Sequence, residues 1–162
     1  MRWLVIGAAA LALAGCAHGR DQVGAETISY STERCFGSCP VYTVTVGPDG
    51  QGIFDGQMFT TTRGKQRFQA TPEQVRAFAA ALASARPTRD RVIEPGSPGC
   101  ANAPTDMPSV NVRWQGTQGA RSLRFYRGCA RENQAIAEAL AAAPATLPIA
   151  ALIGDRSGFS GR

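Results

Sequence analysis

The residues of this sequence with the most evident chemistry are its five cysteines, Cys16, Cys35, Cys39, Cys100 and Cys129. A thiol can carry a lipid, form a disulfide, cycle between oxidised and reduced forms, or bind a soft metal such as copper. The compartment decides between these uses, because disulfides persist only in oxidising surroundings. The chemistry of the cysteines therefore depends first on where the chain folds.

The N-terminal segment indicates export. Arg2 precedes an apolar run, residues 3–14, that is too short to cross a bilayer but has the charged start and small-residue end of a signal peptide. The run closes on Leu13-Ala14-Gly15-Cys16, which resembles the lipobox of bacterial lipoproteins. This resemblance implies that residues 1–15 are removed and that Cys16 becomes an acylated amino terminus. Several acyl chains on one residue give lasting contact with membrane lipid.

The remaining length predicts one domain. We expect residues 16–25 to hold the lipidated cysteine and a flexible tether, residues 26–155 to form a single domain, and residues 156–162 to be a polar tail. Ala17 follows the cysteine, whereas an aspartate there retains proteobacterial lipoproteins in the inner membrane. We therefore expect a lipid-anchored protein of the bacterial cell envelope, in the outer membrane and facing the periplasm.

The charge of the chain is mildly basic, with 17 Lys and Arg against 12 Asp and Glu. The cations are not interleaved with aromatic residues as in nucleic-acid-binding proteins, so we predict no nucleic-acid partner. Arg113 and Arg124 alternate with apolar residues in two predicted strands, which places both on the open face of a sheet. They could form an anion-binding surface there, or simply a solvated basic face.

Four cysteines remain after Cys16, an even number that predicts two disulfides in an exported chain. Three connectivities are possible. A hairpin of Ser109–Trp114 and Arg121–Tyr126 would bring Cys129 close to the loop that carries Cys100. The predicted pairs are therefore Cys100 with Cys129 and Cys35 with Cys39.

Cys35 and Cys39 also allow other interpretations. We favour a structural disulfide that restrains the turn before a strand. A thiol-disulfide redox pair or a copper-handling site is the alternative, but thioredoxin-type motifs have two intervening residues and precede a helix. The segment is similar to the copper-binding segment of cytochrome oxidase assembly factors, which add a histidine from the folded domain; here the sole histidine, His18, lies on the tether. We predict no catalytic residue, metal or cofactor, and no enzymatic activity.

Hydrophobic alternation and turn residues define the elements that position these groups. Thr71-Pro72-Glu73-Gln74 has the residues of a capping box at the start of a helix that ends before Pro87. The order of elements predicts an α+β two-layer sandwich, an antiparallel sheet of five to six strands with two to three helices on one face. The predicted strands are 27–33, 41–46, 52–58, 66–69, 109–114 and 121–126, with a short extended piece at 91–93; the later helices are 131–142 and a short one capped by Thr146 and stopped at Gly154.

One motif resembles a known family. Cys35-Phe36-Gly37-Ser38-Cys39-Pro40, with Asp49-Gly50 and Asp106-Met107-Pro108 downstream, resembles the signature of domain-of-unknown-function family 6438, whose members are uncharacterised bacterial exported domains. The resemblance implies a similar fold and supplies no catalytic residue. We therefore expect a non-enzymatic binding or structural module of the envelope, whose partner is an envelope protein or peptidoglycan.

Overall fold

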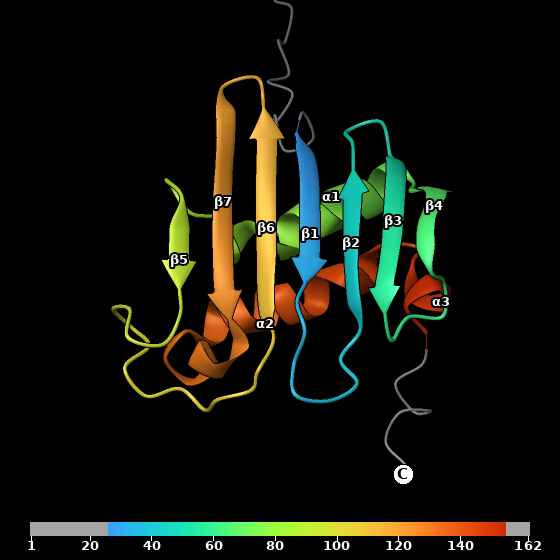
Figure 1. Cartoon of the computed structure of the whole chain (residues 1–162). Helices are drawn as coiled ribbons and strands as arrows, with labels where there is room; N and C mark the ends of the chain where they lie inside the picture. The colour runs from blue at the N-terminus through green and yellow to red at the C-terminus, as the bar shows by residue number, and fades with distance from the viewer. Residues whose placement is uncertain (1–25, 155–162) are drawn as a thin grey trace, which may run out of the picture.

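The computed structural model describes residues 26–154 (Figure 1). The predicted signal peptide, the tether with Cys16 and His18, and the polar tail lie outside the described residues. Expectations for those segments remain predictions.

The described residues form one seven-stranded sheet with the strand order β4-β3-β2-β1-β6-β7-β5. Neighbouring strands are antiparallel, except that β5 runs parallel to β7. The prediction of five to six strands in an antiparallel sheet was therefore wrong in count and at one edge, because the short extended piece pairs with the free edge of β7. The strands are β1 Thr27–Thr32, β2 Val41–Val46, β3 Gln51–Met58, β4 Gly64–Gln69, β5 Arg91–Ile93, β6 Ser109–Gly116 and β7 Gly119–Tyr126.

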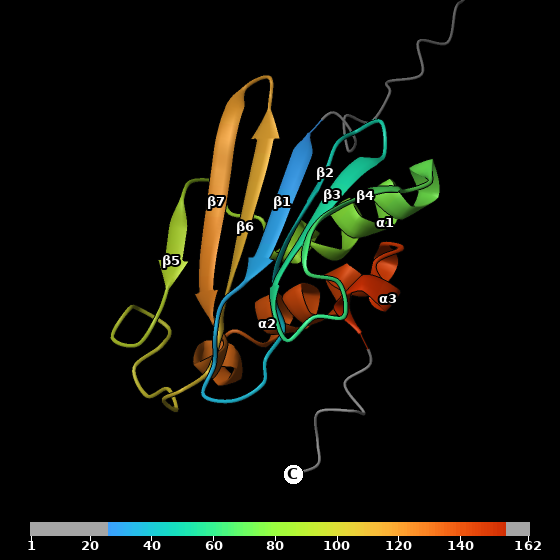
Figure 2. The same ribbon diagram turned by 45° about the vertical axis from the view of Figure 1, so that its right-hand side comes forward.

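All helices lie on one side of this sheet, as Figure 2 shows from an oblique angle. This arrangement confirms the α+β class with two layers. The α-helices are α1 Pro72–Ala81, α2 Gln134–Ala142 and α3 Ala150–Ile153; the 3-10 helices are η1 Ala83–Ala85, η2 Arg127–Glu132 and η3 Ala143–Thr146.

The core lies between the sheet and the helices. Alternation in β2 turns Val44 and Val46 toward the helices, and both are almost fully buried. The ring of Tyr42 stacks on Phe54 from β3 at a centroid distance of 5.3 Å, and Phe78 of α1 is fully buried in the same cluster. The apolar stripe predicted for α1 is therefore the helical half of the core.

The predicted start of α1 is confirmed. The Thr71 hydroxyl accepts a hydrogen bond from the Gln74 backbone N–H, and the Gln74 side chain accepts one from the Thr71 N–H, which completes the capping box. The helix α1 ends at Ala81, and Arg86, which follows the 3-10 helix η1, is extended, as expected of a residue before Pro87.

The later helices begin further along the chain than predicted. The side chain of Asn133 donates to the carbonyl oxygens of Gly99 and Cys129, and its backbone leaves the helical conformation between η2 and α2. The Thr146 hydroxyl donates to the Ala143 carbonyl and so closes η3 rather than capping α3. Leu147 precedes a proline and is extended, which delays α3.

Both expected disulfides are present. Cys100 and Cys129, 29 residues apart, are 0% and 2% exposed and belong to the core. Cys35 and Cys39 are four residues apart and half-buried, in the loop between β1 and β2. The buried bridge fixes the long connection between β5 and β6 to the end of β7, whereas the other restrains only its own loop.

Replacing Cys100 and Cys129 with alanine should lower the free energy of unfolding by about 2–4 kcal/mol, because the unfolded chain loses a long cross-link. Replacing Cys35 and Cys39 with alanine is the matched control and should cost less, since that loop is short. Urea denaturation of the two double variants measures the difference. Equal losses would contradict this assignment.

Candidate binding surface

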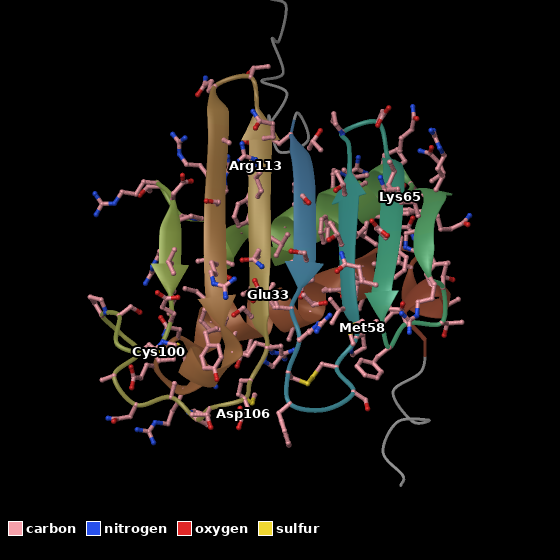
Figure 3. All side chains as sticks on the ribbon, in the orientation of Figure 1. Glu33, Met58, Lys65, Cys100, Asp106 and Arg113 are labelled. Atoms are coloured by element: carbon pink, nitrogen blue, oxygen red, sulfur yellow. A yellow bond between two sulfur atoms is a disulfide. The ribbon has the colours of Figure 1, made fainter. Side chains whose placement is uncertain are left out.

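The face of the sheet that no described helix covers is lined by polar side chains (Figure 3). Its centre consists of short hydroxyl side chains from β1 and β2, in which Ser29 opposes Thr45 and Ser31 opposes Thr43. The Thr45 hydroxyl donates to the Ser29 hydroxyl across the strands at 3.2 Å. The flanking strands carry longer side chains on the same face, so the surface sinks along β1 and β2. We call this surface the open face.

Three shallow hollows lie on the open face. One of about 570 Å³ lies between Thr45, Ile53 and Arg67. A second, of about 200 Å³, includes Ser29 and Arg113 in its lining, and a third, of about 480 Å³, includes Thr43. The second and third share Ser31 and Asn111, so together they form one depression. The depression is open and polar, which suits an extended or flat partner better than an enclosed small molecule.

The open face is basic. Six cations and three acids lie on it or line its hollows, whereas residues 26–154 elsewhere hold seven cations and seven acids. Arg113, Arg67 and Lys65 take part in none of the three salt bridges found among the described residues. Most of the net positive charge of the described domain is therefore on this face. Its charged residues are Arg34, Lys65, Arg67, Arg91, Arg113, Arg124, Glu33, Asp55 and Asp90.

The predicted pair Arg113 and Arg124 does lie on this face, but the two side chains differ. Arg124 forms a two-pronged ion pair with Glu33, with Nη2 at 2.9 Å from Oε2 and Nη1 bonded to Oε1. The amide of Asn111 donates to the same carboxylate at 2.9 Å. Arg113 donates only to the neutral Gln115 side chain, at 3.1 Å. Arg113 therefore offers an uncompensated charge and Arg124 does not.

The ion pair changes the protonation of both partners. The hydrogen bond from Arg124 holds the pKa of Glu33 below its usual value, against an opposing effect of burial. The same bond raises the pKa of Arg124. Glu33 was not predicted from the sequence to be the partner of Arg124. Its position could have indicated this role, because strand alternation places Glu33, one residue beyond β1, on the same face as Ser29 and Ser31.

The other predicted site, residues 35–40, lies at one end of the sheet and is called the cysteine loop below. Its C-terminal end is fixed to β1, because the Thr32 hydroxyl donates to the Pro40 carbonyl at 2.7 Å. Its N-terminal end is fixed to the loop between β5 and β6 by a hydrogen bond from the Phe36 N–H to the Asp106 carbonyl, at 3.1 Å. Phe36 itself is 89% exposed. The loop is thus a rigid support for an exposed aromatic ring.

Residues 26–154 contain neither a cluster of metal ligands nor a membrane-spanning helix. No group of three or more histidine, cysteine, aspartate and glutamate residues in this range could hold a metal ion. No helix in the same range has both the length and the apolar character that crossing a membrane requires.

Comparison with known proteins decides the family. Residues 26–144 match the model of the family described as a domain of unknown function (DUF6438). The chain belongs to that family. The match spans all seven strands, α1, α2 and both disulfides, and confirms the family predicted from the sequence. Neither curated proteins nor solved structures gave a match to the chain.

The segment after the matched region completes the core of this chain. Ile149 is fully buried, and Leu147 is 3% exposed. The N–H groups of Thr61 and Thr62 donate to the carbonyls of Ile153 and Leu152, which joins α3 to the loop between β3 and β4. The folded unit therefore extends at least ten residues beyond the family match, to residue 154.

Glu33→Gln should destabilise the domain at neutral pH and have little effect in acid. The folded-state pKa of Glu33 is lowered, so its contribution is present above the ordinary carboxyl range, about 4.3, and is lost as the pH falls through the lower value in the folded state. Because the side chains of Arg124 and Glu33 are 40% and 39% exposed, we expect only about 0.5–1 kcal/mol at pH 7. Urea denaturation at pH 7 and at pH 3 measures the change. Arg124→Gln is the matched variant, and a loss independent of pH would contradict the assignment.

The two disulfides should differ in reactivity. Mild reductant under native conditions should open Cys35–Cys39, which is half-buried, and leave Cys100–Cys129 closed because both its sulfurs are in the core. Alkylation followed by mass spectrometry identifies the cysteines that were released. Addition of urea should make all four reactive, and early alkylation of Cys100 would be incompatible with this structure.

Proposed function

We propose that this protein is a lipid-anchored, non-enzymatic module of the bacterial cell envelope, which holds its open face against an anionic envelope component. The single observation that carries the proposal is the open face itself. This face holds a polar depression, and its cations Arg113, Arg67 and Lys65 lie outside the salt bridges of the described residues, on a sheet whose other face is covered by helices. A basic surface of this kind attracts an anionic partner.

The anchor belongs to the proposal and rests on the sequence around Cys16, which lies outside the described residues. Thr27, where β1 begins, pairs with Gln115 beside the turn between β6 and β7. The proposed tether therefore joins the sheet at the end where β1 begins, which is opposite the cysteine loop that follows β1. A tether at a corner leaves the open face free to meet a partner.

The alternative is a thiol-disulfide redox or copper-handling protein that uses Cys35 and Cys39. The partial exposure of this bridge supports the alternative, because a catalytic disulfide must be accessible. Its position supports the structural role more strongly, since the bridge fixes a loop that is already held by Thr32 and Asp106. Finding both thiols reduced in protein isolated from cells would favour the alternative and contradict a structural bridge.

The binding proposal predicts that cations on the open face matter more than cations elsewhere. The combined variant Lys65→Gln, Arg67→Gln and Arg113→Gln should weaken cosedimentation with isolated cell envelopes by at least tenfold, because each cation near an anionic surface contributes about 1 kcal/mol. The matched control removes three cations from other surfaces, Arg76→Gln, Arg89→Gln and Arg131→Gln. The unacylated Cys16→Ser form, beginning at residue 16, isolates the contribution of the face.

The control variant should bind as tightly as the parent chain, and binding should fall with rising salt. Equal loss in both variants would show that net charge alone governs binding. That result, or binding unchanged in both, would overturn the proposed role of the open face.

A further inference from the structure

Exposed apolar side chains of the described residues have an uneven distribution. Four large ones are exposed: Phe36 at 89%, Val92 at 53%, Ile53 at 43% and Met107 at 41%. Ile53 lies in register with Thr45 on one flank of the open face, and Val92 lies in register with Arg124 on the other. Phe36 and Met107 lie on the two loops that meet at one end of the sheet.

This arrangement differs from that of a usual protein interface. Such an interface has an apolar centre that excludes water and a polar rim. Here the centre of the open face holds hydroxyl groups and Arg113, while the apolar side chains stand at its periphery. A bilayer surface fits this order, because anionic headgroups meet the polar centre and apolar side chains at the edge reach the acyl boundary.

We propose that the anionic component is the surface of a phospholipid bilayer, on which the open face lies with Phe36 inserted at the headgroup boundary. This inference rests on the proposed function and deepens it. Charge complementarity supports it, since Arg113, Arg67 and Lys65 are exposed cations outside the salt bridges of the described domain. The disulfide Cys35–Cys39 fixes the loop that presents the ring, which lowers the entropic cost of insertion.

The proposed anchor is compatible with this orientation. Ten residues, 16–25, can span at most about 33–36 Å, which exceeds the length of the six-residue strand β1, about 20 Å. The chain can therefore lie along the membrane with the cysteine loop in contact, even though the tether joins the opposite end of the sheet. The anchor also keeps the open face near the bilayer at a high effective concentration, so weak contacts suffice.

Vesicle binding tests the inference directly. The chain beginning at residue 16, with Cys16→Ser, should cosediment with vesicles of phosphatidylcholine containing 30% phosphatidylglycerol, and much less with phosphatidylcholine alone. Phe36→Ala should weaken binding about tenfold. The control for lost apolar surface is Ile53→Ala, at the edge of the open face. It should weaken binding less than Phe36→Ala does, because the side chain of Ile53 is less exposed than that of Phe36.

A fluorescent probe reports insertion independently of affinity. Trp114 is 2% exposed, so a tryptophan placed at position 36 dominates any change on membrane contact. In Phe36→Trp the emission should shift to the blue on adding the anionic vesicles, and brominated acyl chains should quench it. The matched control is Gln118→Trp, at the turn between β6 and β7, which should show neither effect.

The outcomes separate this inference from the function on which it rests. Binding to isolated peptidoglycan, lost in the Lys65, Arg67 and Arg113 variant, without vesicle binding would overturn the bilayer inference and leave the open face as a binding surface. Vesicle binding with an unshifted Phe36→Trp would overturn insertion. If binding to vesicles, peptidoglycan and cell envelopes is unchanged in the Lys65, Arg67 and Arg113 variant, both the bilayer inference and the proposed function are overturned.

Discussion

The fold depends on one constraint, that only one face of the sheet is buried. In β2 the residues Tyr42, Val44 and Val46 are buried, whereas Thr43 and Thr45 point to the opposite side. A sheet with one apolar face needs a single layer of helices, and α1 and α2 supply it. The opposite face remains in contact with solvent. Its side chains do not have to fill the core, so they can serve binding.

Local patterns explain how much of this arrangement was predictable. The alternation in β2 and the capping box at Thr71 depend on residues that are close in sequence, and both predictions were right. The parallel pairing of β5 with β7 was not predictable, since three residues carry too little pattern to indicate a partner. The start of α2 depends on bonds from Asn133 to Gly99 and Cys129, and a contact between distant segments leaves no periodicity in the sequence.

In the candidate site, too, local features were predictable from the sequence and contacts between distant segments were not. Strand alternation was sufficient to place Arg113 and Arg124 on the open face. It could not distinguish them, because the difference is a carboxylate from another strand: β1 lies beside β6 and brings Glu33 to Arg124 across 91 residues of sequence. Sheet order, which the sequence does not specify locally, therefore decides which arginine has a compensated charge.

The exposed ring of Phe36 follows from how the cysteine loop is constrained. An exposed aromatic costs the folded state little relative to the unfolded chain, since it contacts water in both. Its usefulness for binding depends on what must be ordered when a partner arrives, and here the Cys35–Cys39 bridge and the bonds through Thr32 and Asp106 have already ordered the backbone. The same covalent bond chemistry thus has two consequences in one domain. At Cys100 and Cys129 it stabilises the core, and at Cys35 and Cys39 it lowers the entropy that a contact at Phe36 would lose.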